Sequence, residues 1–164
     1  MSKITPNYYQ ENSPSKERLR DLRRLVEREG RTLPADFDID DIHWVTDRVG
    51  ITDFEGCEEA VLNDYFTINV AGELDSSAQM QADINPGSGK VKKDLTKLAV
   101  LINKVLTDND DTKVVVHCAM GMERSPLTVV WYLHKYHDKT IDEAYDMVQR
   151  ARPVAVDRRE WVDW

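Results

Sequence analysis

Apolar residues recur along much of the chain at the spacing of amphipathic helices. Between residues 91 and 106, apolar side chains return every three or four positions, which places them on one face of a helix. A second such stretch lies at residues 15–29, where Ser15 is a candidate N-cap and Gly30 a candidate residue just beyond the C-terminus. Further helices are predicted at residues 58–65, 125–137 and 140–152, the last opened by the capping-box pattern from Thr140 to Glu143.

Short apolar runs without helical spacing predict β-strands at residues 42–46, 66–71 and 113–116. The run at 113–116 reads Lys-Val-Val-Val and does not alternate, which is typical of a parallel strand covered on both faces. Because strands alternate with helices along the chain, the pattern indicates an α/β fold with a mainly parallel sheet.

The composition narrows the classes of function. The 164 residues suit one domain with a sizeable core. A formal net charge of −8 argues against a general nucleic-acid binder and against docking on an anionic membrane, because both need a basic surface. Two cysteines make no disulfide framework, so we expect a reducing compartment, the cytoplasm. No apolar run is long enough to span a membrane, and the N-terminus is unlike a signal peptide.

The most informative chemistry lies between the strand 113–116 and the helix 125–137, in the sequence HCAMGMERS from His117 to Ser125. A short loop that contains Gly121 can turn its backbone N–H groups inward, and the N-terminus of the following helix adds partial positive charge. Residues 118–124, named here the anion loop, are therefore predicted to bind an anion.

Two side chains of the anion loop indicate that the bound anion is a phosphate. The planar guanidinium of Arg124 can clamp two phosphate oxygens at once. A cysteine in such electropositive surroundings has a lowered pKa, so Cys118 is predicted to be a thiolate. A thiolate beneath a phosphoryl group is a nucleophile in position.

The pattern His-Cys-x-x-Gly-x-x-Arg-Ser resembles the signature of cysteine-dependent protein phosphatases, closest to the dual-specificity branch. The resemblance covers roughly residues 42–161. It implies an α/β fold with a central, mainly parallel sheet of four to five strands flanked by helices. The chain then divides into a flexible arm at 1–14, an N-terminal helix with an acidic connector at 15–41, and a phosphatase domain at 42–164.

The resemblance also implies roles for single residues. Cys118 would attack phosphorus to form a phosphocysteine, Arg124 would hold the equatorial oxygens, and the Ser125 hydroxyl would stabilise the departing thiolate. His117 would orient the loop and tune the thiol, and the mechanism needs no metal or cofactor. The residues expected around the substrate phosphate are Ala119, Met120, Gly121, Met122, Glu123 and Arg124.

A general acid must protonate the leaving oxygen. In the family this is an aspartate on a mobile loop, some thirty to forty residues before the cysteine. Asp83 fits best, because it lies 35 residues before Cys118 and just before a predicted turn and helix. Asp75 and then Glu73 are the alternatives in the long polar stretch 73–90.

The side chains of the anion loop also bear on the substrate. They include no lysine, whereas phosphoinositide phosphatases of this superfamily carry basic residues there, and Glu123 would repel a highly charged substrate. A phosphoprotein monoester is therefore the expected substrate and partner, with phosphotyrosine and phosphoserine or phosphothreonine both accepted. The same chemistry on a phosphoinositide, sugar, nucleotide or RNA end, or phosphate binding without turnover, stays open, as does the oligomeric state.

Several other features have simpler readings. The arginines of the first helix form a solvated face or a docking surface for an acidic partner, and the aspartates at 34–41 lack the pattern of a calcium loop. Residues 86–91 only partly resemble a nucleotide-binding loop. Cys57 is expected to be an inert thiol, although oxidation could join it to Cys118.

Overall fold

The computed structural model describes residues 16–163, with side chains from Arg20 onward. The predicted cap at Ser15 and the arm at 1–14 lie outside the described residues, as does the side chain of Leu19, predicted to lie on the apolar face of the first helix. The elements, in order, are α2 (Lys16–Arg28), β1 (His43–Trp44), β2 (Val49–Thr52), α3 (Gly56–Leu62), β3 (Phe66–Asn69), β4 (Met80–Gln81), α4 (Val91–Asp108), β5 (Val114–His117), α5 (Arg124–Tyr136), α6 (Ile141–Ala151) and a short 3-10 helix η1 (Arg159–Trp161).

Five strands form one sheet in the order β1-β2-β5-β3-β4. Four of them are parallel, and only β1, at one edge, is antiparallel to its neighbour. The central strand β5 is buried along its whole length, as its unbroken apolar sequence predicts. The predicted α/β fold with a mainly parallel sheet of four to five strands is confirmed.

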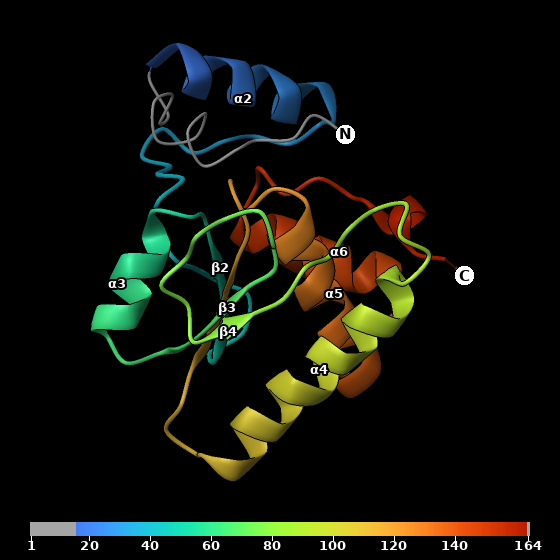
Figure 1. The fold of residues 1–164 in the computed structure, drawn as a ribbon. Coiled ribbons are helices and arrows are strands. Elements are labelled where there is room, and N and C mark those ends of the chain that lie inside the picture. Colours follow the sequence, from blue (N-terminus) through green and yellow to red (C-terminus); the bar gives the residue numbers. More distant parts are fainter. Residues whose placement is uncertain (1–15, 164) are drawn as a thin grey trace.

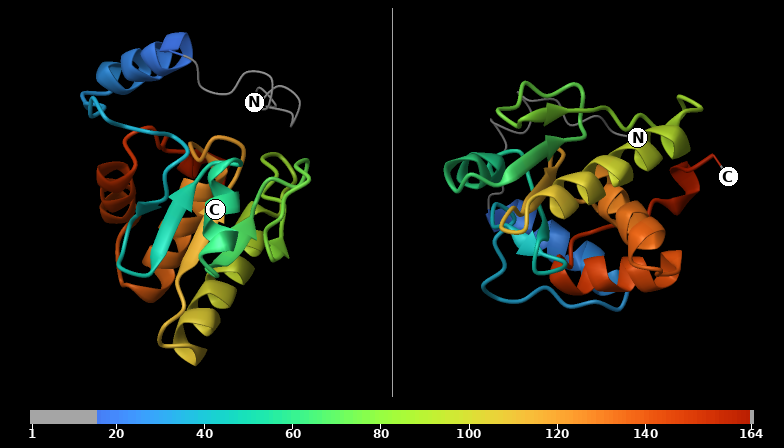
Figure 2. Two further views of the ribbon diagram at one scale, coloured as in Figure 1. Left: turned by 90° about the vertical axis from the view of Figure 1, so that its left-hand side faces the viewer. Right: turned by 90° about the horizontal axis from the view of Figure 1, so that it is seen from below.

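Helices cover both faces of this sheet. α4, α5 and α6 pack together on one side, and α3 lies on the other (Figures 1 and 2). α5 follows β5 directly and contacts both β2 and β5, so it runs back across the middle of the sheet. The carboxyl ends of the central strands and the amino end of α5 therefore meet at one edge, which is where ligands bind in open parallel sheets.

Several element boundaries differ from the sequence prediction. The predicted strand 42–46 is shortened to β1, and α3 begins at Gly56 instead of residue 58. β2 was not predicted as a strand, and the polar stretch 73–90 contains the edge strand β4, whose two residues are both exposed. The capping box at α6 is confirmed, since Thr140 accepts a hydrogen bond from the Glu143 amide and Glu143 accepts one from the Thr140 amide.

α2 stands at the end of the molecule where the loop after β5 lies (Figure 1). It is attached through the buried side chains of Leu22 and Val26. Arg23 donates hydrogen bonds to the carbonyls of residues 33–35, so at least one arginine of this helix has a structural contact. Arg31 donates to the carbonyl of Pro153 and thereby ties the connector to the end of α6.

Within residues 16–163, no helix is both long enough and apolar enough to cross a lipid bilayer.

Candidate active site

The anion loop lies between β5 and α5, at the carboxyl edge of the sheet. Cys118 follows the last residue of β5, and Arg124 is the first residue of α5. Both are buried, with Cys118 3% and Arg124 6% exposed. The sequence prediction that a strand, a loop and a helix N-terminus converge here is matched by the fold.

The carbonyl groups of the anion loop are held from outside. Each carbonyl from Cys118 to Met122 accepts a hydrogen bond from a group beyond the loop. The donors are His117 Nδ1 to Cys118, the Phe54 amide to Ala119, Arg152 to Met120 and Gly121, and the Val156 amide to Met122. Because a peptide group is planar, a carbonyl that points outward turns the next N–H inward. The loop therefore presents amide donors toward its centre, as anion binding requires.

Gly121 makes the tight curve of the loop possible. Its φ is +68°, in the left-handed region that glycine adopts without strain. A Cβ at this position would also lie 2.6 Å from the Thr52 carbonyl oxygen and 2.7 Å from Arg152 Nη2. Both the backbone angle and the close packing therefore require glycine.

Several donors converge on the sulfur of Cys118. Its Sγ lies 3.2 Å from Ser125 Oγ, and the backbone amides of Ser125 and Gly121 also hydrogen-bond to it. Burial alone would raise the pKa of the thiol, but the nearby Arg124 charge and these hydrogen bonds outweigh it and lower the pKa below its usual value. The site thus favours a thiolate, which can act as a nucleophile.

Arg124 is paired with Glu73. Nη1 and Nη2 donate to the two carboxylate oxygens at 2.7 and 2.6 Å, in a fork that matches both groups. Glu73 follows β3, where Asn69 fixes the turn by accepting from the Ala71 amide and donating to the Ala71 carbonyl. A guanidinium has five N–H donors, so two bonds to Glu73 leave the Nε–H edge for a second anion.

The structure brings Asp83 close to this pair. Asp83 Oδ1 accepts a hydrogen bond from the Gly72 amide at 3.1 Å, next to Glu73. Burial tends to lower the pKa of Arg124. The nearby groups of Glu73, Cys118 and Asp83 outweigh this effect and raise the pKa above its usual value. Asp83 and Asp75 are both exposed to solvent.

The remaining predicted residues of the loop have different surroundings. Ala119 and Met120 are buried in the hydrophobic core, and Met122 packs against it. The carboxylate of Glu123 accepts from Arg158 at 2.8 Å, so an ion pair offsets its negative charge. The repulsion of highly charged substrates that Glu123 alone would exert is therefore weakened.

His117 is fully buried and connects the loop to the β3–β4 segment. Nδ1 lies 2.9 Å from the Cys118 carbonyl and Nε2 lies 2.7 Å from Ser76 Oγ. The pKa of His117 is lowered to about 4, mainly by burial and also by the Arg124 charge. The hydrogen bond to Cys118 acts in the opposite direction. The ring is therefore neutral at pH 7, and because a carbonyl can only accept, the proton sits on Nδ1.

Three residues of this neighbourhood could not be recognised in the sequence. Glu73 was considered only as a proton donor, Arg152 only as the end of the last helix, and Arg158 not at all. Their partners lie 51, 32 and 35 residues away in the chain, so no local pattern marks them.

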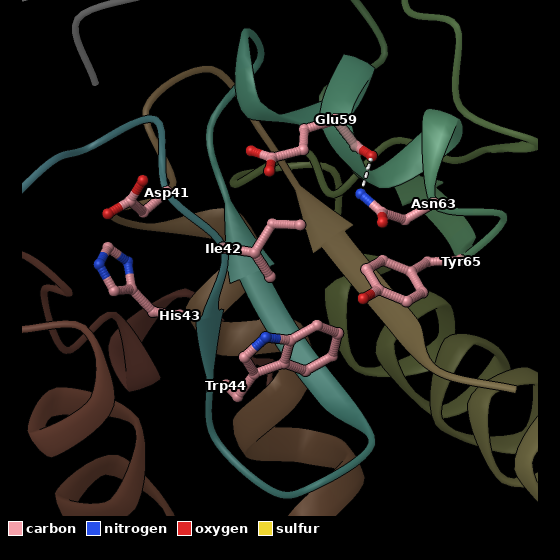
Figure 3. A pocket seen from close by; sticks show the side chains of 7 residues that line it. All are labelled: Asp41, Ile42, His43, Trp44, Glu59, Asn63 and Tyr65. Atoms are coloured by element: carbon pink, nitrogen blue, oxygen red, sulfur yellow. Dashed lines mark hydrogen bonds between the residues drawn. The ribbon is translucent and has the colours of Figure 1, made fainter. Parts of the chain in front are cut away.

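A hollow of about 300 Å³ lies beside the edge strand β1, apart from the anion loop. Its lining includes Trp44 and Tyr65 and the carboxylates of Asp41 and Glu59 (Figure 3). Across the described residues 16–163, no three or more histidine, cysteine or acidic side chains are grouped so that they could hold a metal ion.

Comparison with known proteins identifies the family. Residues 51–164 match the family described as "Dual specificity phosphatase, catalytic domain". A 44-residue segment is 43% identical to human protein phosphatase Slingshot homolog 3; it spans 27% of this chain but only 7% of that protein.

Solved structures share the fold. A mouse putative dual specificity phosphatase complexed with zinc tungstate has a TM-score of 0.64 at 18% identity, over 79% of this chain and 86% of that one. Human DUSP28 has a TM-score of 0.62 at 16% identity, over 73% and 86%. The match over residues 51–164 covers most of the chain, and we conclude that the chain belongs to the family of dual-specificity phosphatase catalytic domains.

Proposed function

We propose that this chain hydrolyses phosphate monoesters of phosphotyrosine and of phosphoserine or phosphothreonine proteins through a phosphocysteine intermediate. The observation that carries the proposal is the Cys118 sulfur, which receives hydrogen bonds from Ser125 and from loop amides and has a lowered pKa. The phosphatase chemistry follows from the family, and the roles of single residues rest on the geometry.

In the first step, the Cys118 thiolate attacks phosphorus, a sulfur–phosphorus bond forms and the bond from phosphorus to the leaving oxygen breaks. The loop amides and the free Nε–H edge of Arg124 hold the equatorial oxygens, where charge spreads in the transition state. Glu73 supports this role, because its fork with Arg124 fixes the guanidinium before substrate arrives.

In the second step, water attacks phosphorus and the sulfur–phosphorus bond breaks. The electron pair returns to sulfur, so a donor to the nascent thiolate lowers the barrier. Ser125 is suited to this task because its hydroxyl is fully buried and lies 3.2 Å from Sγ. Phosphate is released and the thiolate is restored.

The proton for the leaving oxygen comes, in this proposal, from Asp83. It stands beside Glu73 through the Gly72 amide, and its charge acts on Arg124. The same carboxylate then takes the proton from the attacking water. Asp75 is the alternative, whereas Glu73 is better suited to positioning because both of its oxygens are already bound to Arg124.

The surroundings of the loop favour one phosphate at a time on a protein. Ala119, Met120 and Met122 contribute no charge, and Glu123 is paired with Arg158. A phosphoinositide or triphosphate would bring further negative charges to a site whose only described loop cation is Arg124. We therefore place non-protein phosphates second. His117 is proposed to hold the Cys118 carbonyl, without taking a proton from the thiol.

The cytoplasm is the proposed compartment, because two free cysteines, one of them reactive, suit a reducing environment. We propose residues 42–164 as the catalytic domain and residues 15–41 as its N-terminal helix and connector.

The test compares wild type with Cys118→Ser on p-nitrophenyl phosphate. The substitution should abolish hydrolysis, while inorganic phosphate still protects the anion loop from proteolysis. Phosphotyrosine peptides, phosphoserine peptides, phosphoinositides and triphosphorylated RNA are then offered to the wild type. Faster turnover of a non-protein phosphate would replace the proposed substrate class, and phosphate protection without any turnover would indicate a binding module.

A further inference from the structure

Arg152 is a buried cation outside the reacting groups. It caps the C-terminus of α6, and 0% of its surface is exposed. A buried guanidinium is strongly destabilising unless its N–H groups find acceptors. The acceptors that Arg152 binds therefore indicate which part of the structure this buried side chain holds in place.

Two of these contacts are on the anion loop. Nε donates to the Gly121 carbonyl at 2.9 Å, and Nη2 donates to the Met120 carbonyl at 2.8 Å. One guanidinium therefore satisfies two adjacent carbonyls of the loop. The fork geometry of arginine suits this pair of acceptors, as the single ammonium of lysine would not.

The other contacts anchor Arg152 on the opposite side. Nη2 also donates to the Ile39 carbonyl at 2.9 Å, and Nη1 donates to His43 Nδ1 at 2.6 Å and to the Asp41 carbonyl at 3.4 Å. Asp41 and His43 lie side by side at one end of the hollow near β1 (Figure 3). Burial and the Arg152 charge lower the pKa of His43 to about 4, so its ring is neutral and can accept.

The Met120 carbonyl shares its peptide plane with the Gly121 amide. In a trans peptide the C=O and N–H point in opposite directions, so fixing one fixes the other. The Gly121 amide is one of the donors to the Cys118 sulfur. In the same way, the Gly121 carbonyl fixes the amide of Met122. A line of contacts therefore runs from Arg152 through the Met120–Gly121 peptide to the sulfur.

We propose that Arg152 is a positioning residue of the anion loop: by holding the carbonyls of Met120 and Gly121, it aims the next two amides at the thiolate and the bound phosphate. This inference rests on the proposed function. Arg152 acts through the peptide groups, and it ties their orientation to the connector at residues 39–41 and to β1.

The charged and titratable groups near the sulfur are held by other elements. Arg124 faces Cys118 from α5, and His117 adjoins it from β5. Glu73 and Asp83 face Arg124 from the segment after β3. Arg152 itself faces His43 and Asp41. Replacing Arg152 leaves the first four groups in place, so a change at the thiol reports on the loop amides.

The experiment measures the rate of Cys118 alkylation by iodoacetamide against pH, with peptide mass spectrometry to separate Cys118 from Cys57. The full chain is compared as wild type, Arg152→Met and Arg152→Lys. Arg150→Met is the matched control, since Arg150 lies on the same helix but is exposed and forms a surface ion pair with Asp146. Turnover of p-nitrophenyl phosphate, inhibition by inorganic phosphate and thermal melting are measured on the same proteins.

Arg152→Met should raise the pH midpoint of alkylation by about one unit, weaken phosphate inhibition and lower kcat by roughly 10- to 100-fold. Arg152→Lys should fall between it and wild type, and Arg150→Met should match wild type. An unchanged midpoint in a folded variant overturns the proposal. Loss of cooperative melting in both variants also overturns it, because Arg152 would then support the fold as a whole. A wild type without turnover would refute the proposed function, while the alkylation midpoint would still test Arg152.

Discussion

Arg124 and Glu73 form two parallel hydrogen bonds of 2.7 and 2.6 Å between a guanidinium and a carboxylate that lie 51 residues apart in the chain. The pair joins the first residue of α5 to the turn after β3. It leaves the Nε–H edge of Arg124 available and fixes the direction in which that edge points.

Glu73→Gln tests whether this pair orients Arg124 for phosphate. The amide accepts only one of the two hydrogen bonds, so Arg124 loses part of its preorganisation. We expect kcat/KM for p-nitrophenyl phosphate to fall about tenfold, equivalent to about 1.4 kcal/mol in the transition state. Asp146→Asn, which breaks an exposed pair on α6, is the control. A rise in kcat/KM would mean instead that Glu73 competes with substrate for the arginine.

Asp83→Asn tests the general acid. Without a proton donor, phenyl phosphate should react about 100-fold more slowly, because phenolate is a poor leaving group. p-Nitrophenyl phosphate, with a good leaving group, should lose only a few-fold. Asp75→Asn is the comparison, and if it shows the leaving-group dependence instead, the role passes to Asp75.

Gly121→Ala tests the geometry of the anion loop. At φ +68° a side chain is strained, and its Cβ would lie 2.6 Å from the Thr52 carbonyl oxygen and 2.8 Å from Arg152 Nε. We expect about 2–3 kcal/mol of lost stability in urea unfolding and loss of most turnover.

Gly87→Ala is a matched control for this substitution. Gly87 has φ +86° but no atom within 4 Å of the position of a Cβ, so it suffers the backbone strain alone. It should cost about 1 kcal/mol and leave turnover intact. Equal losses in the two variants would show that packing around Gly121 contributes nothing.

The sequence predicted most of the fold because the signals were local. The unbroken apolar run of β5 and the 3.6-residue spacing in α4 each lie within one element. β2 was missed because Gly50 interrupts its apolar pattern; a Cβ there would lie 2.9 Å from Ile42 and Trp44 side-chain atoms, so glycine is set by packing. β4 was missed because both of its residues are exposed and carry no alternation.

The candidate site likewise contains residues that a local sequence pattern identifies and residues that only the folded structure reveals. Cys118, Arg124 and Ser125 lie within eight consecutive residues, so their spacing identified them before the structure did. Glu73 and Arg152 reach the loop only through tertiary contacts. A residue that acts by holding a distant carbonyl or guanidinium has no motif of its own, and only the folded chain places it.

One buried histidine, His117, and one half-buried histidine, His43, predict how stability depends on pH. His43 and His117 both have a pKa of about 4 in the folded protein, below their ordinary 6.5, chiefly because burial disfavours the charged ring. Between about pH 6.5 and 4 the unfolded chain therefore binds protons that the folded chain does not, so stability falls as the pH decreases through this window. For His117, which is fully buried, the loss is on the order of 3 kcal/mol.

Urea unfolding at pH 7, 5.5 and 4.5 measures this slope. His43→Gln should flatten it, because one of the two groups no longer titrates. A wild-type stability that stays constant or increases toward pH 4.5 would contradict the assignment of neutral rings to His43 and His117.

Direct trapping of the intermediate tests the central claim, that Cys118 is the nucleophile. Wild type is mixed with p-nitrophenyl phosphate, quenched in acid within milliseconds and digested, and the peptides are analysed by mass spectrometry. We predict one added phosphoryl group on the Cys118 peptide and none on the Cys57 peptide, with Cys118→Ser giving neither adduct nor product. Turnover by wild type with no phosphoryl group on Cys118, or turnover that persists in Cys118→Ser, would contradict the mechanism.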